Sequence, residues 1–290
     1  LRLLNHAREQ LEAIIDYICE RLEGLVPKPR TYRKRARKEY LQAAKKRRIK
    51  GNVLRKALRK QLGYLRRNLE HIARMRNAFP EKALLSEREE SRLCILELLY
   101  QQQLEMYQNR THRVDHRIVS IDQPHVRPIV RGKARRNTEF GAKIALSVDN
   151  GFCLIELLSW ENFNESRTLQ QAAESYRHRH GYYPEVICAD AIYRTRENLN
   201  YCKEGGIRLS GPPLGRPPAD PEINRERKRI TRQDAARRNI VEAKFGEAKR
   251  AYSLGCIRGK RKDTGETLII VQFITMNLWS MLRDFLRIFL

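Results

Sequence analysis

The chain has 290 residues, which is enough for one large domain or two ordinary domains with a sizeable apolar core. It carries 59 Lys and Arg residues against 34 Asp and Glu residues, so its formal net charge is +25. No compact fold needs that excess, because like charges repel one another, and a polyanionic partner, first of all nucleic acid, is therefore expected.

The cysteines and the N-terminus indicate the setting in which the protein works. None of the six cysteines forms a CxxC pair, so neither a zinc site nor a disulfide framework is expected. No signal peptide is visible, and the sequence opens on Leu1 rather than Met, from which we expect an incomplete N-terminus. An intracellular, reducing environment is the simplest interpretation.

Residues 1–110 are predicted to form a basic, all-helical region that contacts DNA. Helical spacing of apolar residues predicts helices over residues 1–26 and 86–107. Between them, residues 28–67 hold the densest positive charge, with Glu39 as the only acid. The residues predicted to contact DNA in this region are Lys34, Arg35, Arg37, Lys45, Lys46, Arg47, Arg48, Arg55 and Lys56.

The second half of this basic segment also has an apolar stripe, so we expect a folded helix rather than a disordered tail. One face of the helix would be apolar and the other would face phosphates. The stripe consists of Leu54, Leu58, Leu62, Leu65, Leu69 and Ile72.

Residues 111–290 are predicted to form a second domain, which begins with strands. RIVSID (117–122) is β-rich, and FGAKIALSVD (140–149) alternates apolar residues with polar or small ones. Asn-Gly at 150–151 is typical of a hairpin turn, after which FCLIELLSW (152–160) would form the returning strand.

Helices and strands then alternate along the chain. A helix is predicted through residues 166–180, and EVICAD (185–190) is a short apolar run that suits a buried parallel strand. A short helix over 196–206 and the strand IRLSG (207–211) follow. The fold class expected from this order is α/β, a mixed sheet flanked by helices and preceded by the basic helical region.

The chain is predicted to end in an irregular connection and two helices. GPPLGRPPADP (211–221) suits neither a helix nor a core strand, and residues 223–250 have a basic helical pattern. The final apolar run (268–290) contains Gln272, Asn277 and three charged residues, which are costly in a bilayer centre. A buried terminal helix, rather than a membrane span, is therefore expected.

Three carboxylates are candidates for an active site. Asp122 closes RIVSID, Asp190 closes EVICAD, and Glu242 lies on the basic helix between Arg238 and Lys249. Convergence of the three acids would create two divalent-metal sites, and hard oxygen ligands suit Mg²⁺. Arg238, Glu242 and Lys249 fall within roughly 40° on the helix surface. They are either a surface ion-pair ladder or an acid held between two phosphate-binding cations.

The sequence resembles the DDE transposases of bacterial insertion sequences in the motifs around these acids. That family's second-acid motif, an apolar strand followed by Ala-Asp and a Tyr three residues on, matches VICADAIY and assigns Asp190. Its third-acid motif, Tyr-x2-Arg-x3-Glu-x6-Lys, is matched at Arg238, Glu242 and Lys249, whereas Ala235 stands at the Tyr position. RIVSIDQPHVRPIVRGKARRNTEFGAKIALSVD and IRLSGPPLGRPP also resemble one branch of the family.

The resemblance implies an RNase H-like catalytic domain with a metal site. Two Mg²⁺ ions, for which Mn²⁺ can substitute, would be held by Asp122, Asp190 and Glu242, with Arg238 and Lys249 on DNA phosphates. The RNase H-like fold places the first acid on the first strand, which favours Asp122. Asp149, next to the Asn-Gly turn, is the alternative, and a turn-forming role is its simpler interpretation.

The expected function is Mg²⁺-dependent cleavage of the ends of an insertion sequence, followed by strand transfer. The expected partners are double-stranded DNA at the element ends and at the target, together with a second copy of the chain; no membrane is expected. The implied location is the bacterial cytoplasm, on the nucleoid. Two rival interpretations stay open: a non-enzymatic basic nucleic-acid-binding protein, and a simple RNase H-like nuclease that shares the site but transfers no strand.

Overall fold

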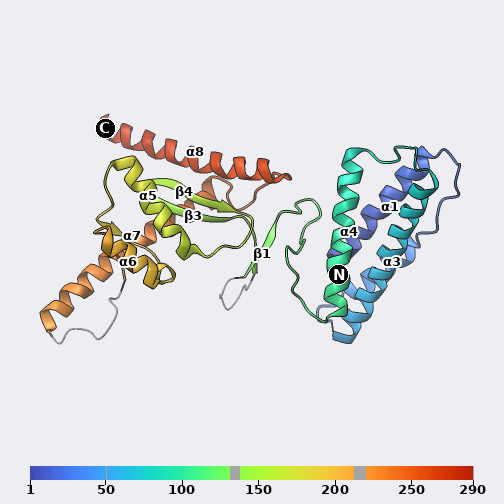
Figure 1. Cartoon of the computed structure of the whole chain (residues 1–290), viewed down its shortest axis with the longest axis horizontal. Helices are drawn as coiled ribbons and strands as arrows, with labels where there is room; N and C mark the ends of the chain where they lie inside the picture. Colours follow the sequence, from blue (N-terminus) through green and yellow to red (C-terminus); the bar gives the residue numbers. More distant parts are fainter. Residues whose placement is uncertain (50, 131–137, 212–219, 290) are drawn as a thin grey trace. The chain divides into compact units, whose positions relative to one another are not determined.

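The computed structural model describes residues 1–49, 51–130, 138–211 and 220–289, and it divides into two compact units (Figure 1). The first unit is Leu1–Phe140 and the second is Gly141–Leu290. Residues 111–140, which the sequence pattern grouped with the second domain, are part of the first unit. Most of the predicted connection GPPLGRPPADP, residues 212–219, lies outside the described residues. The expected α/β class with an all-helical N-terminal region is confirmed.

Four long helices form most of the first unit. They agree with the predicted helices, and the basic segment is divided between the second helix and the third. Ser86 starts the last of them, because its hydroxyl accepts a hydrogen bond from the backbone N–H of Glu89. The helices are α1 (Arg2–Arg21), α2 (Arg33–Ala44), α3 (Gly51–Ala78) and α4 (Glu87–Gln108).

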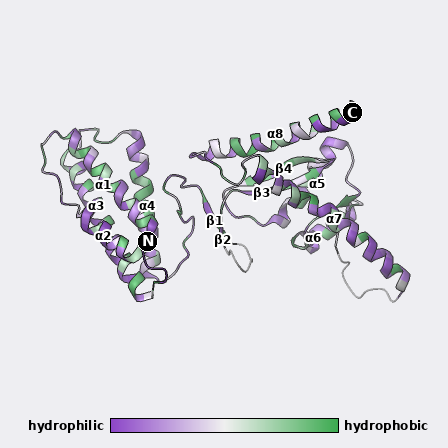
Figure 2. Ribbon diagram, turned by 180° about the vertical axis from the view of Figure 1, so that it is seen from behind, coloured by the Kyte–Doolittle hydropathy of each residue, from purple (hydrophilic) through white to green (hydrophobic). Residues whose placement is uncertain are grey.

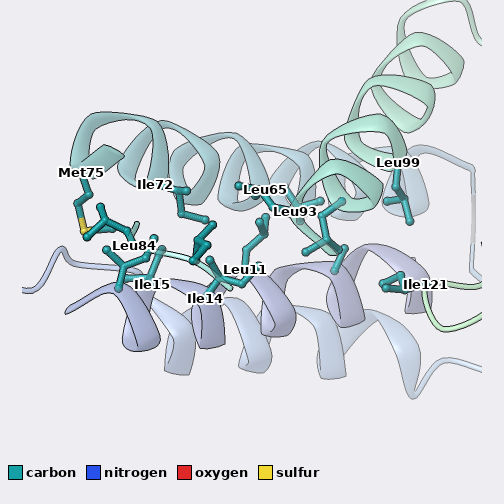
Figure 3. Close-up of a cluster of buried hydrophobic side chains, with 14 of the residues drawn as sticks. Leu11, Ile14, Ile15, Leu65, Ile72, Met75, Leu84, Leu93, Leu99 and Ile121 are labelled. Atoms are coloured by element: carbon teal, nitrogen blue, oxygen red, sulfur yellow. The ribbon is translucent and has the colours of Figure 1, made fainter. Parts of the chain in front are cut away.

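An aliphatic core joins α1, α3 and α4 (Figure 3). Leu62, Leu65 and Ile72, from the predicted stripe of α3, are at most 5 % exposed there. They pack with Leu11 of α1 and Leu93 of α4 in one cluster. The apolar stripe therefore faces the core, as predicted, and leaves the basic side chains on the outside.

The prediction of a strand over RIVSID is wrong, because residues 117–122 are irregular. Ile118 and Ile121 are buried in the core of the first unit. The N–H of Ile118 donates to Oε1 of Gln102 at 2.9 Å, and Nε2 of Gln102 donates to the carbonyl of His116 at 3.2 Å. The N–H of Ile118 is thus bonded to a helix side chain instead of a neighbouring strand.

The Asn-Gly hairpin is confirmed in the second unit. Strands β3 (Lys143–Asp149) and β4 (Phe152–Ser159) are antiparallel. Asn150 and Gly151 both have positive φ, +47° and +86°, as this kind of two-residue turn requires. The predicted strand over 140–149 is interrupted at Ala142, and its first part belongs to β2 (Thr138–Gly141), which pairs with β1 (Arg127–Val130).

The remaining strands form a short parallel pair among helices. β5 (Val186–Ile187) is parallel to β6 (Arg208–Leu209), and the strands of the described residues form three two-stranded sheets. Helices cover the β3–β4 hairpin, since α5 and α8 contact β4 and α7 contacts β3. The other elements of this unit are η1 (Glu165–Arg167), α5 (Thr168–His180), η2 (Ala191–Tyr193), α6 (Arg196–Glu204), α7 (Pro221–Ala251) and α8 (Lys262–Phe289).

The expectation that the terminal helix is buried is wrong for one of its two faces. Ile269, Phe273 and Met276 are at most 2 % exposed, but the opposite face of α8 carries large exposed apolar side chains, and green turns recur along the helix in Figure 2. By length and composition alone, Lys262–Arg287 could cross a membrane, and it is the one such stretch among the described residues. The expectation failed because the core of the second unit has room for one side of this helix.

Polar contacts fix the inner face of α8 to the hairpin. Oδ1 of Asn277 accepts the N–H of Cys153 at 2.8 Å, while its Nδ2 donates to the carbonyl of the same residue at 2.7 Å. Gly265 allows the close approach of Trp160, because a Cβ at this position would lie 3.0 Å from the indole ring. The Trp160 N–H also donates to Glu266 at 3.0 Å.

Candidate active site around Asp190 and helix α7

The parallel pair β5–β6 holds the loop that carries Asp190. The N–H of Ser210 donates to the carbonyl of Ile187 at 2.9 Å, and the N–H of Ala189 donates to the Ser210 hydroxyl at 3.0 Å. These bonds extend the pairing by two residues beyond β5, up to the residue before Asp190. The predicted position of Asp190 after a parallel strand is therefore correct, and its side chain is 58 % exposed.

The segment after Asp190 is fixed to β6 by an arginine. Nη1 of Arg194 donates to the carbonyls of Leu209 and Ser210 at 3.0 and 2.6 Å. Gly211 has a φ of +109°, and a Cβ there would lie 2.8 Å from the Arg194 side chain, so only glycine suits this place. Tyr193, the tyrosine of the second-acid motif, packs against the buried cluster of α5, α6 and β6.

An ion pair between the buried carboxylate of Asp234 and the exposed Arg208 attaches α7 to the same parallel pair of strands. Both carboxylate oxygens of Asp234 accept from the Arg208 guanidinium, at 2.7 and 2.9 Å. Asp234 is 5 % exposed, and the hydrogen bond from Arg208 lowers the pKa of this carboxyl below its ordinary value. The Cys188 thiol, two residues before Asp190, lies 3.7 Å from the same carboxylate. This pair sets the position of α7 beside the Asp190 loop.

One turn further along α7, Arg238 reaches Asp190 directly. Its Nη1 lies 3.1 Å from Oδ1 of Asp190. Residues four apart lie on one face of a helix, so Asp234, Arg238 and Glu242 stand in a row, and Glu242 is one turn beyond the residue that contacts Asp190. The second-acid motif and the third-acid motif, about 50 positions apart in the sequence, thus meet at this ion pair.

Glu242 and Lys249 are exposed farther along α7. Among the residues that the structure describes, Glu242 forms no hydrogen bond or ion pair. Phe245, on the same stripe, contacts Phe273 of α8 edge to face, with ring centroids 6.2 Å apart. The face of α7 that carries Arg238, Glu242 and Phe245 therefore contacts Asp190 near one end and α8 near the other.

The two candidates for the first acid are in different surroundings. Asp122 is in the first unit, where its Oδ1 lies 3.8 Å from Arg92, and the strand end on which its assignment rested is absent. Asp149 ends β3 and is hydrogen-bonded to the His180 ring at 2.7 Å, so it ties the hairpin to the end of α5. This contact fits the structural interpretation of Asp149, and the assignment of Asp122 stays a prediction.

The predicted DNA-contacting residues of the first unit are exposed except for Arg55. Arg55 lies over the Tyr107 ring, 4.2 Å from its centroid, and donates to the Tyr107 carbonyl at 3.1 Å, which gives it a structural role between α3 and α4. Arg35 also contacts Glu39, at 3.4 Å. The exposed residues are Lys34, Arg35 and Arg37 on α2, Lys45, Lys46, Arg47 and Arg48 after it, and Lys56 on α3.

The exposed carboxylates of Asp190 and Glu242 fit a hard cation such as Mg²⁺ as part of its ligand set. Such an ion usually takes one or two carboxylates and completes its coordination with water and phosphate oxygens. Within the described part of the chain, no group of three or more His, Cys, Asp and Glu side chains lies close enough together to hold a metal ion.

Three residues of this region were missed in the sequence: Arg194, Arg208 and Asp234. Asp234 could have been found by extending the stripe of Arg238 and Glu242 back by one turn, which leads to an acid at the same helical spacing. The two arginines gave no signal, because 59 basic residues occur in the chain and nothing local marks these two.

Part of the chain that contains this site matches a known protein family. Residues 187–279 match the model of a family described as "Transposase DDE domain". The match begins in β5 and includes Asp190, Arg238, Glu242 and Lys249. No curated protein and no solved structure matches the chain. Residues 187–279 are therefore similar to a transposase DDE domain, and the resemblance to DDE transposases is confirmed over this part of the chain.

Proposed function

We propose that the protein is the transposase of an insertion sequence, which cuts the DNA ends of the element and joins them to target DNA. The observation that carries the proposal is the contact between Arg238 and Asp190, because it joins the second-acid loop to the third-acid helix inside the matched region. The net charge of +25 supports DNA as the substrate.

Asp190 and Glu242 are the proposed ligands of Mg²⁺, for which Mn²⁺ can substitute, and Asp122 is kept as the proposed first acid. When bound, the cations would stabilise negative charge on the attacking and leaving oxygens of a phosphodiester. The loop bonds around Ala189 hold Asp190 in place, and Arg238 contacts it through one nitrogen, which leaves other guanidinium N–H groups for a DNA phosphate. Lys249, two turns beyond Glu242, supplies a second cation for the backbone.

The reaction proposed for this site has two steps, and each step breaks one P–O bond and forms another. Water attacks a phosphodiester at the end of the element, which breaks one P–O bond and frees a 3′-hydroxyl. That hydroxyl then attacks a phosphodiester of the target, so one bond is formed for each bond broken. We further propose that two copies of the chain act on the two element ends, in the bacterial cytoplasm on nucleoid DNA.

The exposed acids favour an enzyme over a non-enzymatic DNA-binding protein. An exposed carboxylate beside a phosphate-binding arginine repels DNA, and a protein that only binds has no use for it. Asp190 is such a carboxylate, since its side chain is 58 % exposed next to Arg238. A simple nuclease would share these residues, so strand joining has to be measured separately.

The test is a cleavage assay on a supercoiled plasmid that carries the element, with Mg²⁺ and a second plasmid as target. Asp190→Asn and Glu242→Gln are expected to abolish nicking and joining, while DNA affinity stays nearly unchanged. Glu222→Gln is the matched control, because Glu222 is another exposed carboxylate of α7 and should be dispensable. Full activity in either variant contradicts the metal-site assignment, and nicking without joined products identifies a nuclease.

The same assay decides which residue is the first acid. Asp122→Asn is expected to abolish nicking, whereas Asp149→Asn should keep it, because the Asp149 carboxylate is hydrogen-bonded to His180. The reverse result would assign Asp149.

A further inference from the structure

The outward face of α8 is an apolar surface with regular spacing. Val271, Ile274, Leu278, Met281 and Phe285 follow one another at intervals of 3, 4, 3 and 4 residues. We call these five residues the α8 seam. Between 49 % and 59 % of each of them is exposed.

The spacing of the α8 seam is that of helices that pair with other helices. An average interval of 3.5 residues keeps the side chains on one line along a helix, as at the contact positions of a coiled coil. The buried residues of α8 lie on its other face. The inner face of α8, with Phe273 and Met276, already packs against that core, and Asn277 is bonded to β4.

The surface is large enough for a specific interface between two protein chains. With the flanking Ile270, Trp279 and Leu282, the α8 seam exposes on the order of 800 Å² of mainly apolar side chain, which is what each partner buries in a standard interface. Exposed apolar patches of this size on a protein surface mark interaction sites.

Charge indicates which partner can cover the α8 seam. Residues 267–282 contain no charged side chain, in a chain whose net charge is +25. Two copies of so basic a protein repel each other wherever their basic surfaces meet, and an uncharged face avoids that cost. DNA is a poor partner for an apolar face because its phosphates would lose their water without gaining a cation.

A membrane-spanning arrangement conflicts with the attachment of α8. A spanning helix needs an apolar environment over about 20 residues. Here the inner face is bonded to protein at both Glu266 and Asn277, and Arg283 and Asp284 follow within two turns. Lipid could therefore contact the outer face at most.

We propose that the α8 seam binds the α8 seam of a second copy of this chain, around a two-fold axis. The same patch then serves both partners, so the contact closes into a dimer and does not continue into a filament. The inference deepens the two-copy arrangement of the proposed function, on which it rests for its biological purpose. The dimer itself forms without DNA or metal, so it can be tested apart from cleavage.

The experiment is sedimentation velocity of the whole chain from low to high micromolar concentration. The unchanged protein is expected to sediment as a dimer, and a variant with both Ile274→Lys and Leu278→Lys as a monomer with unchanged helical circular dichroism. Ile223→Lys is the matched control, because Ile223 is an exposed isoleucine of α7, at 46 %, and the variant should stay a dimer. The milder Leu278→Ala should weaken the dimer by about tenfold or more.

Two results would overturn the proposal: an unchanged protein that is monomeric at every concentration, or a dimer that the double variant and Leu278→Ala leave intact. Flotation with phosphatidylcholine vesicles tests whether the α8 seam binds a membrane surface instead. A monomer whose binding to vesicles is lost in the double variant would assign the face to a membrane surface instead. Since plasmid nicking is scored separately, a monomer that still nicks DNA overturns the dimer and leaves the proposed function standing.

Discussion

The two units attach their helices in different ways. In Leu1–Phe140, one continuous aliphatic cluster joins three long helices and the segment around Ile121 (Figure 3). In Gly141–Leu290, α7 is attached to β6 by the Asp234–Arg208 pair, and α8 is attached to β4 through the Asn277 amide.

This difference matters because apolar contacts are spread over many side chains whereas polar contacts depend on single pairs. The aliphatic core uses the inner faces of the helices of the first unit, so the basic side chains proposed to contact DNA phosphates lie on the outside. A hydrogen-bonded pair has one geometry, and the row of Asp234, Arg238 and Glu242 takes its position from such a pair. The first unit is therefore suited to the proposed general binding of DNA, and the second to holding the side chains of Arg238 and Glu242 in a fixed position.

The largest effect is expected from a substitution in the core of the first unit. Leu65 is 0 % exposed, and Leu65→Ala should lower the free energy of unfolding of that unit by about 2–5 kcal/mol, because it leaves a cavity. Hydrogen exchange read by mass spectrometry should show the loss in α1, α3 and α4 but not in residues 141–290. Leu98→Ala, at a 48 % exposed leucine of α4, is the control and should change little. Equal loss of protection in both units would mean that they unfold as one.

A smaller effect is expected on DNA affinity. Changing Lys45, Lys46, Arg47 and Arg48 together to Gln should weaken binding to a duplex about 10- to 100-fold and reduce the slope of log K against log salt by up to about 3–4, since each phosphate contact releases counterions. Fluorescence anisotropy at several salt concentrations measures both.

A charge-matched variant shows whether DNA affinity depends on the position of the basic residues or only on the total charge of the protein. Changing the exposed Arg258, Lys260, Arg261 and Lys262 of the second unit to Gln removes the same charge. It should cost less affinity than the change in the first unit. Equal losses in the two variants would contradict a special role of the first unit.

The smallest expected effect concerns the pair that positions α7. Asp234→Asn should destabilise the second unit by about 1–2 kcal/mol and reduce nicking, because Arg208 loses a charged acceptor. Thermal unfolding measures the first effect and the plasmid assay the second. Asp263→Asn, at the exposed pair with Arg261, is the control and should leave both unchanged.

The pH dependence of this effect has a definite sign. Because Arg208 lowers the pKa of Asp234 in the folded protein from its ordinary value of 3.8, the pair stabilises the fold fully above that pH. The contribution is lost as the pH falls through the lowered pKa. The difference between the unchanged protein and Asp234→Asn should therefore shrink below about pH 4, and a difference that grows in acid would contradict the ion pair.

Local patterns in the sequence predicted what local contacts determine. The Asn-Gly turn, the apolar stripe of α3 and the placement of Asp190 after a parallel strand were correct, because each depends on neighbouring residues. RIVSID was predicted wrongly, since its apolar residues would suit a strand equally well. Its conformation depends on Gln102, a side chain of α4 that no local pattern connects with Ile118.

The same limit applies to the candidate site. The shared helix face of Arg238 and Glu242 could be read from their spacing, and its orientation toward Asp190 follows from the distant pair of Arg208 and Asp234. The exposed side of α8 could not be foreseen, because an apolar run does not indicate how many of its faces the core can cover.

The two hydrogen bonds between Asn277 and Cys153 also have a consequence for the order of folding. The Asn277 amide occupies an N–H and a C=O on the outer edge of β4, as one residue of a neighbouring strand would. The ribosome makes β4 more than 100 residues before α8 is complete. Before α8 is synthesised and docks, the nascent hairpin has an open edge that can pair with strands of other chains. Docking of α8 covers part of this edge and so reduces misassembly of the newly made protein.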